Sequence, residues 1–291
     1  MIYVDNLEKQ IKGKTILSGI SFEVAEGDCI ALIGPNGAGK TTLMSCLLGD
    51  LQVNKGTVLL NQSKPRSKEN KQKIAVLPQE NTIPTDLKVG ELLAFFQAIY
   101  KDSLTDQEID CLLRFSKEQK NQLAGKLSGG QKRLLAFILC LIGKPSLLFL
   151  DEPTAGMDTS TRQHFWEIIS QLKATGVTIF YTSHYIEEVE HTAERILVLH
   201  QGKLLRDTTP FAMRSEENEK QVTLPKRFAE QVKDLESIYE LTYKQDTLSF
   251  KTKEIDVVWS KLQAVGCQMA DLELQNKTLL NTLFDTTKEE E

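Results

Sequence analysis

Short apolar runs alternate with helix-like segments along the first 210 residues of the chain. Each run spans four to six residues and is rich in Val, Ile, Leu and Phe. Runs of this length suit strands buried inside a sheet and are too short for helices. The predicted strands are Cys29–Ile33, Gly56–Leu60, Ile74–Leu77, Leu147–Leu150 and Val177–Thr182.

The N-terminal end of this region has a different pattern, in which apolar and polar residues alternate. Ile2–Leu7 and Ile20–Val24 alternate in this way, which predicts antiparallel strands beside the buried ones. Arg195–His200 and Lys203–Arg206 are joined by a Gln-Gly turn and predict a closing hairpin. Between these ends, Leu87–Leu141 repeats its apolar residues at helical spacing. We therefore expect a parallel sheet with an antiparallel edge and a helical subdomain at about residues 85–145.

The character of the sequence changes after Pro210. Ser215–Lys220 is hydrophilic and predicts a linker, and Glu254–Ala264 predicts a helix that Gly266 ends. We expect one large domain at 1–213 and a small C-terminal α+β domain at 214–291. Further elements expected there are strands at Val222–Leu224, Tyr239–Tyr243, Leu248–Lys251 and Met269–Leu274 and a helix at Asn276–Phe284.

A glycine-rich segment follows the strand Cys29–Ile33 and opens a helix. The helix is indicated by Leu43 and Leu47, four positions apart. The segment has the pattern G-x-x-x-x-G-K-T, whose backbone amides cradle phosphates while Lys40 adds a positive charge. An ordinary glycine-rich turn is the alternative, but strand, Lys-Thr pair and helix together favour a phosphate-binding loop. The predicted nucleotide-binding residues are Gly34, Pro35, Asn36, Gly37, Ala38, Gly39, Lys40, Thr41 and Thr42.

Polar side chains follow three of the predicted strands. Gln79 comes after Ile74–Leu77, the pair Asp151 and Glu152 follows Leu147–Leu150, and His184 follows the strand ending at Thr182. In open α/β sheets, ligands bind at the carboxyl ends of the strands. Two adjacent carboxylates are costly there unless a cation compensates them. The sequence therefore predicts one composite site at this edge.

A second arrangement suited to anions lies inside the helical region. Leu127–Gln131 reads Leu-Ser-Gly-Gly-Gln, in which Ser128 is positioned to cap the following helix. The two glycines leave bare amides at the helix N-terminus. Taken alone, this segment is weak evidence for a site.

Composition narrows the function classes. The net charge of −5 argues against a nucleic-acid partner, and we interpret the basic run at 64–73 as a solvated loop, with a local basic patch as the alternative. The longest apolar stretch, Leu134–Ile142, is half of the roughly 18 residues that a membrane span needs. Five scattered cysteines and an N-terminus without a signal pattern predict a cytoplasmic protein.

Taken together, in this order, these segments resemble the ATP-binding subunit of ABC transporters. The resemblance covers residues 1 to about 210 and includes Ala155–Asp158. It implies a P-loop NTPase core with ATP and Mg²⁺ as cofactors. Lys40 and the loop amides would hold the β- and γ-phosphates, while Thr41 and Gln79 would bind Mg²⁺ and Asp151 would orient the water shell of the metal.

The same resemblance implies the hydrolytic and dimer residues. Glu152 would polarise the attacking water and His184 would contact the γ-phosphate. Two subunits would sandwich two ATP molecules, either as a homodimer, which the complete motifs allow, or as a heterodimer. The residues implied across that dimer are Ser128, Gly129, Gly130, Gln131 and Asp158.

One position departs from the family pattern. Where the family commonly stacks an aromatic ring on adenine, the aligned residue is Ile11. Aliphatic contact should hold the base less well than aromatic stacking does. We therefore expect weak discrimination between bases, with Tyr3 as an alternative ring.

Within the family, 184–190, 195–196 and 201–203 look most like export-type (ABC-2) transporters, and 271–284 is similar to their accessory domain. The first function hypothesis is an ATPase that docks on polytopic transmembrane subunits at the inner face of the cell membrane. The alternative is a soluble ABC-type ATPase serving a cytosolic assembly process. A third hypothesis, a binding module without turnover, conflicts with the intact catalytic positions. Candidate contacts to the transmembrane subunit are Ile83, Pro84 and Leu87.

Overall fold

The computed structural model describes residues 1–80, 83–183, 186–215, 219–233 and 235–276. The chain forms two compact units, Met1–Thr209 and Pro210–Glu291, and their division lies close to the expected boundary at residue 213. Within the ranges described, every helix falls short of the length and apolar character that a membrane span requires.

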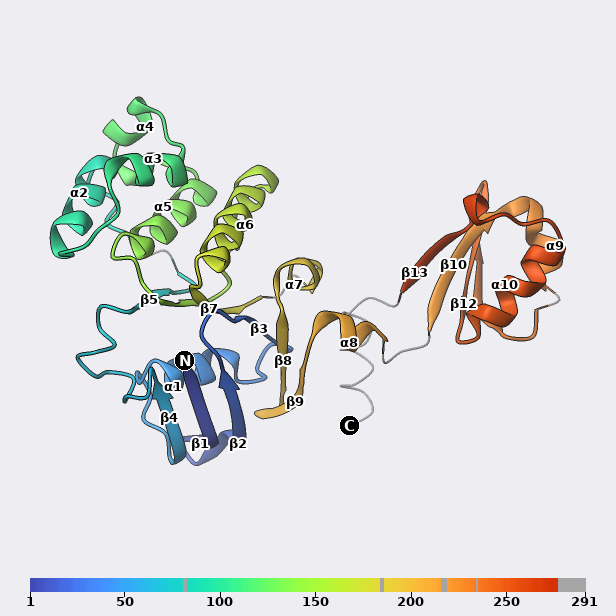
Figure 1. The fold of residues 1–291 in the computed structure, drawn as a ribbon, viewed down its shortest axis with the longest axis horizontal. Helices are drawn as coiled ribbons and strands as arrows, with labels where there is room; N and C mark the ends of the chain where they lie inside the picture. Colours follow the sequence, from blue (N-terminus) through green and yellow to red (C-terminus); the bar gives the residue numbers. More distant parts are fainter. Residues whose placement is uncertain (81–82, 184–185, 216–218, 234, 277–291) are drawn as a thin grey trace. The chain divides into compact units, whose positions relative to one another are not determined.

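The centre of the first unit is a six-stranded sheet (Figure 1). Its strands are parallel except for the last, which pairs antiparallel with its neighbour in the predicted closing hairpin. Three central strands are buried at every position, as expected for a sheet covered on both faces. In spatial order the strands are β5 (Ile74–Leu77), β6 (Leu147–Leu150), β7 (Thr178–Thr182), β3 (Cys29–Ile33), β8 (Arg195–His200) and β9 (Lys203–Thr208).

A three-stranded antiparallel sheet forms the expected edge. Its order is β2 (Lys14–Val24), β1 (Ile2–Ile11) and β4 (Lys55–Leu60). The alternation of β1 and β2 turns one face inward, where it shares a core with the helix α1 (Lys40–Leu47) and with apolar side chains of the six-stranded sheet. The fold class expected for the first unit is therefore confirmed.

The helical subdomain is built from helices that lie together in Figure 1. They are α2 (Val89–Ile99), α3 (Asp106–Leu113), α4 (Lys117–Asn121) and α5 (Gly129–Leu141), with a 3₁₀ turn at Ala124–Lys126. Capping boxes begin α3 and α4, which explains why short polar segments are helical there. Two further helices, α6 (Thr159–Ala174) and α7 (Ile186–Thr192), follow β6 and β7.

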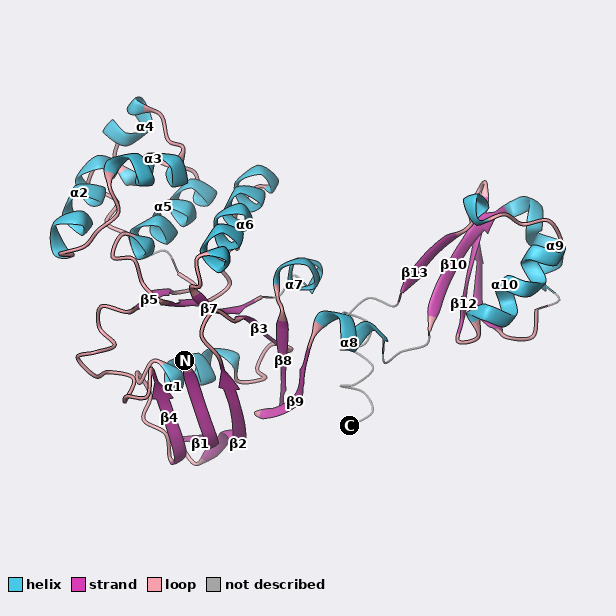
Figure 2. Cartoon of the chain, viewed as in Figure 1, coloured by secondary structure: helices cyan, strands magenta, loops and turns pink. Residues whose placement is uncertain are grey.

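The second unit carries a four-stranded antiparallel sheet with helices on one face (Figure 2). Its strand order, β11-β12-β10-β13, is that of a split βαβ arrangement. Its elements are α8 (Pro210–Ser215), β10 (Lys220–Pro225), a 3₁₀ turn (Lys226–Phe228), α9 (Ala229–Lys233), β11 (Ile238–Tyr243), β12 (Thr247–Thr252), α10 (Ile255–Ala264), a 3₁₀ turn (Met269–Asp271) and β13 (Glu273–Asn276).

One expected strand in this unit is wrong in its first half. Met269–Asp271 is a 3₁₀ turn, because the Asp271 carboxylate accepts a hydrogen bond from the Gln268 backbone N–H at 3.1 Å and so closes the turn. The strand begins only at Glu273. The helix expected at 276–284 starts on a residue of β13, and the rest of it lies outside the described residues.

Candidate functional site

The glycine-rich loop joins β3 to α1 and folds around the Lys40 side chain. Lys40 Nζ donates hydrogen bonds to the carbonyl oxygens of Gly34 at 2.7 Å and Pro35 at 3.1 Å. The side chain is buried, and this burial lowers the pKa of Lys40, which the nearby carboxylates of Glu152 and Asp151 counteract. The ammonium group is thus held in place at the N-terminus of a helix, where anions are favoured.

Two glycines of this loop are required by close contacts. A Cβ atom on Gly34 would lie 2.0 Å from the Leu199 carbonyl oxygen of β8. Gly39, the N-cap residue of α1, has φ +105°, and a Cβ there would lie 2.8 Å from Leu17 Cδ2. The loop is therefore pressed against β8 and β2, and only glycine fits at these two positions.

A cavity of about 370 Å³ opens beside the loop. The cavity gathers most of the predicted phosphate loop with the residues at the ends of β5 and β6. Ala38, a residue of the loop, is buried and does not line the cavity. Ile11 lies at the tip of the β1–β2 hairpin, opposite Lys14, and is exposed. The lining residues are Ile16, Asn36, Gly37, Gly39, Lys40, Thr41, Thr42, Gln79 and Glu152.

The side chains that follow β5 and β6 contact one another, as parallel neighbouring strands require. Gln79 Nε2 donates to Glu152 Oε2 at 3.0 Å. Thr182 Oγ1, at the end of β7, donates to Asp151 Oδ1 at 2.5 Å and accepts from the Glu152 backbone N–H at 2.9 Å. Glu152 adopts φ +46°, a left-handed conformation that is uncommon for residues other than glycine and that clusters at functional sites.

The predicted site residues divide into groups. Lys40, Thr41, Gln79 and Glu152 share the cavity, and Asp151 lies directly beside Glu152 in the chain. The candidate His184 lies outside the described residues. The hydroxyl, amide and carboxylate oxygens of Thr41, Gln79 and Asp151 are ligands of the kind that Mg²⁺ accepts, and two of these residues line the cavity, so the chain fits this ion.

The Ser128 segment forms a second group with Asp158. Ser128 Oγ accepts from the Gln131 backbone N–H at 3.2 Å, and Gln131 Oε1 accepts from the Ser128 N–H at 3.0 Å, so α5 begins with a capping box. A Cβ on Gly130 would lie 3.5 Å from Asp158 Oδ2. Asp158 caps α6 through Thr161, and the backbone hydrogen bond from Thr161 lowers the pKa of Asp158.

Arg133 is a residue of this region that the sequence interpretation missed. The residue is 1% exposed, and the helix that contains it is apolar from Leu134 onward. Helical spacing is the signal that could have revealed its burial. Arg133 shares the i, i+3, i+4, i+7 face of the helix with Gly130, Leu134 and Phe137, and all of these residues are buried. A charged residue on the buried face of a helix needs a polar partner.

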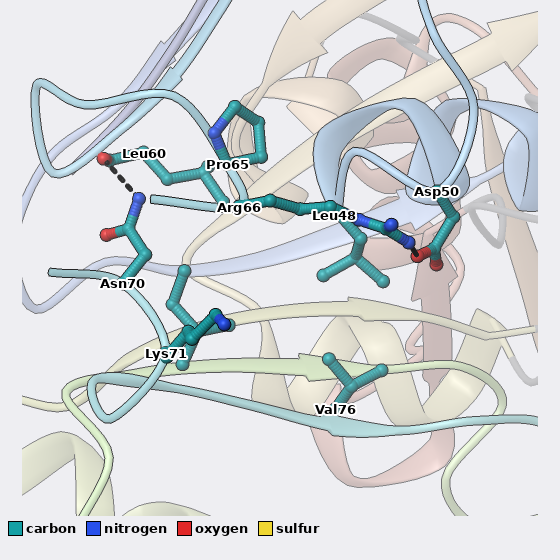
Figure 3. Close-up of a pocket in the computed structure, with 9 residues that line it drawn as sticks. Leu48, Asp50, Leu60, Pro65, Arg66, Asn70, Lys71 and Val76 are labelled. Carbon is teal, nitrogen blue, oxygen red and sulfur yellow. Dashed lines mark hydrogen bonds and ion pairs between the residues drawn. The ribbon is translucent and has the colours of Figure 1, made fainter. Parts of the chain in front are cut away.

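A larger cavity, of about 620 Å³, lies between the end of α1, β4 and β5 (Figure 3). One wall comes from the basic segment 64–73, which is ordered around the buried Asn70. Asn70 Nδ2 donates to the Leu60 and Lys64 carbonyl oxygens at 3.0 Å each, and Arg66 pairs with Asp50 at 2.5 Å. This cavity shares no described lining residue with the one beside Lys40.

Comparison with known proteins decides the family. Residues 17–155 match the sequence profile of a family described as ABC transporter. The chain is also 37% identical over 214 residues to the Nod factor export ATP-binding protein I of Burkholderia orbicola (strain AU 1054), covering 72% of this chain and 70% of that relative. The chain belongs to the ABC transporter family. It is an ABC ATPase, and the resemblance to export-type subunits is confirmed.

This ABC ATPase is also similar to a second ATP-binding protein and to two solved structures. It is 36% identical over 213 residues to the linearmycin resistance ATP-binding protein LnrL of Bacillus subtilis (strain 168), covering 70% of this chain and 68% of LnrL. CbiO1 of Clostridium perfringens, part of the ABC transporter complex cbiONQ, has a structure with TM-score 0.63 and 25% identity, covering 74% of this chain and 90% of CbiO1. The cassette MJ0796 bound to ADP and Pi shares the fold, with TM-score 0.63 and 20% identity over 72% of this chain and 99% of the cassette.

Proposed function

We propose that two ABC ATPase subunits, at least one of them this chain, close around two ATP molecules, and that hydrolysis powers export through separate transmembrane subunits. The observation that carries the proposal is the single cavity that joins Lys40 and Thr41 to Gln79 and Glu152. Phosphate, metal and water ligands are thereby concentrated in one place. Relatives named for Nod factor export and linearmycin resistance support an export role.

In this proposal, the chain positions the polyphosphate and the attacking water. Lys40 and the amides at the start of α1 hold the phosphates. Thr41 and Gln79 would hold Mg²⁺ and Asp151 would orient its water shell, and the bound ion would supply positive charge to the phosphates. The Glu152 carboxylate, held by Gln79 at 3.0 Å, accepts a hydrogen bond from the water and aligns it for attack on the γ-phosphate. His184 supplies a further contact to that phosphate.

The site is completed by the second subunit. The described residues that line the cavity around Lys40 do not include Ser128–Gln131. Their capped helix presents free amides, and we assign them to the γ-phosphate of ATP bound by the partner, with Asp158 at the same seam. ATP then favours the closed dimer because it contacts both subunits, and hydrolysis removes that preference.

An exposed apolar face of the helical subdomain supports a separate transmembrane partner. Phe95 and Ile99 lie four residues apart on α2 and are 60% and 56% exposed, and Leu87 is 39% exposed. Neighbouring exposed apolar side chains mark protein or membrane contacts. We place the docking surface for the transmembrane subunit on these three residues together with the expected contacts Ile83 and Pro84.

Co-purification tests this function. The tagged chain, expressed in its own host and extracted in detergent, should recover a polytopic membrane protein. The double variant Phe95→Ser, Ile99→Ser should lose that protein while it still binds ATP, and Val265→Ser, which removes an exposed apolar side chain of the second unit, should not. Recovery of a cytosolic assembly, with no membrane protein, would favour the alternative function and overturn peripheral membrane localisation.

A further inference from the structure

The guanidinium group of Arg133 donates hydrogen bonds to backbone carbonyl oxygens of two separate segments. Nε donates to Pro153 at 3.0 Å, and Nη1 donates to Pro78 at 2.5 Å. Nη2 donates to Asp151 at 2.7 Å and to Glu152 at 3.2 Å. One buried cation therefore binds the two segments that carry the catalytic carboxylate and its glutamine neighbour.

These carbonyl groups need such a donor because the strands have just ended. Pro78 follows β5 and Asp151 follows β6, at the paired strand ends Leu77 and Leu150. Beyond that point the backbone has left the sheet ladder, so its carbonyl oxygens need partners other than the neighbouring strand. The planar fork of an arginine reaches several acceptors at once, whereas a lysine ammonium is a point charge.

Arg133 also belongs to the helix that begins with the Ser128 cap. It lies two residues after Gln131, whose side chain closes the capping box. The rest of the buried face is packed, as in the contact of Phe137 with Phe165 of α6, whose ring centroids are 4.5 Å apart. Arg133 therefore ties the helix that begins with the Ser128 cap to the backbone segments that carry Gln79 and Glu152.

We propose that Arg133 is a positioning residue that couples the two ATP sites of the dimer. It sets the position of the Ser128–Gln131 cap, which serves the partner's ATP, relative to the Gln79 and Glu152 of its own chain, which serve its own ATP. Nucleotide bound in one site thereby changes the geometry that the chain offers to the other site. This inference rests on the proposed function, because it needs the cap to act across a dimer.

The kinetic test compares Arg133→Lys and Arg133→Met with Arg195→Lys. Arg195 is a matched control, since it also holds a backbone carbonyl, that of Glu23, at 2.6 Å, and pairs with Asp207 away from the cavity. We expect both Arg133 variants to lose on the order of 10- to 100-fold in kcat, as misplacement of catalytic groups does. ATP affinity should change by less than about threefold, because the Lys40 loop is intact. The Hill coefficient for ATP should fall towards one, and Arg195→Lys should leave kcat and the Hill coefficient unchanged.

A binding measurement separates this inference from the proposed function. If Glu152→Gln fails to form an ATP-dependent dimer, the proposed function fails first. If it forms that dimer and Arg133→Lys keeps the kcat and the Hill coefficient of the unsubstituted chain, the coupling role of Arg133 is wrong.

A second measurement uses only the unsubstituted chain, so its outcome does not depend on whether a variant folds. In the unsubstituted chain, kept dilute and monomeric, a non-hydrolysable ATP analogue should change hydrogen exchange of the amides at 131–134. Unchanged exchange at these amides, with analogue bound, would overturn the inference.

Discussion

Gln79 Nε2 donates to Glu152 Oε2 across 3.0 Å, so residues just beyond the ends of two neighbouring strands are in contact. This contact orients the carboxylate towards the cavity that Lys40 shares. A substitution at Gln79 would therefore change the orientation of the Glu152 carboxylate directly.

Glu152→Gln should bind ATP and stall. The amide keeps the shape of the side chain but lacks the negative charge that polarises the attacking water, and losses on the order of 10²- to 10⁴-fold in turnover are typical when such a group is removed. A sizing column should then show a dimer that depends on ATP. Turnover equal to that of the unsubstituted chain would remove Glu152 from its assigned role.

Lys40→Ala should lose most of its nucleotide affinity. A charge-assisted contact to phosphate contributes on the order of 2 to 3 kcal/mol, which is about 30- to 150-fold in Kd. Titration with ATP by calorimetry measures this loss, and Lys244→Ala, an exposed lysine of the second unit, is the charge control. The phosphate-loop assignment does not survive if Lys40→Ala binds ATP normally.

Gly34→Ala should be much more damaging than Gly37→Ala. A methyl group at Gly34 would lie 2.0 Å from the Leu199 carbonyl oxygen, so the loop must move away from β8. Gly37 has φ +82° with open space around it, so alanine there costs only the left-handed conformation, about 1 to 2 kcal/mol. Thermal unfolding and ATP binding of both variants check the ranking, and equal effects would contradict the close contact.

Ile11→Tyr should tighten ATP binding if this hairpin position faces the base. Ile11 is 39% exposed at the hairpin tip, whereas Ile16 lines the cavity. An aromatic contact adds about 0.5 to 1.5 kcal/mol beyond burial. We expect the unsubstituted chain to turn over ATP and GTP comparably. A preference for ATP on the order of a hundredfold, nearly 3 kcal/mol, would show that another group reads the base.

Glu188→Gln should alter the pH dependence of stability. Glu188 accepts a hydrogen bond from Thr154 Oγ1 at 2.9 Å and lies 3.2 Å from Arg162 Nε. Burial raises the pKa of Glu188 above its ordinary value of 4.5, although Thr154 and Arg162 oppose this. The folded state therefore binds the proton more tightly than the unfolded state does. The contribution of this group to the unfolding free energy then decreases as pH rises from 4.5 through the raised pKa.

Chemical denaturation at several pH values measures this effect. The stability of the unsubstituted chain minus that of Glu188→Gln should decrease over that window as pH rises. Glu26→Gln, at an exposed turn, controls for the loss of a carboxylate. A difference that grows with pH would show that the Arg162 pair, not burial, dominates.

Periodicity and strand ends predict much of this molecule. The buried runs locate β3, β6 and β7, and parallel strands bring their carboxyl ends to one edge, so the meeting of Gln79 with Glu152 follows from the sequence. The phosphate loop is equally local, because its glycines and Lys40 are consecutive in the chain.

What the sequence does not predict depends on contacts between distant segments. Arg133 binds carbonyl oxygens 18 to 55 positions away, and a backbone acceptor has no residue type that a motif can reveal. Helix α6 is missed because its buried residues, such as Phe165 and Ile169, are diluted by polar ones. Ile16 enters the cavity wall only through the pairing of β1 with β2.

The strand order of the second unit has a consequence for synthesis of the chain. β10 pairs with β13, so its sheet cannot be completed before residues at 273–276 have been translated. The described strands of the first unit are all present once Thr208 has emerged from the ribosome. The ATP-binding unit of a nascent chain can therefore fold while the second unit is still being translated. This agrees with the N-terminal-first order of domain folding.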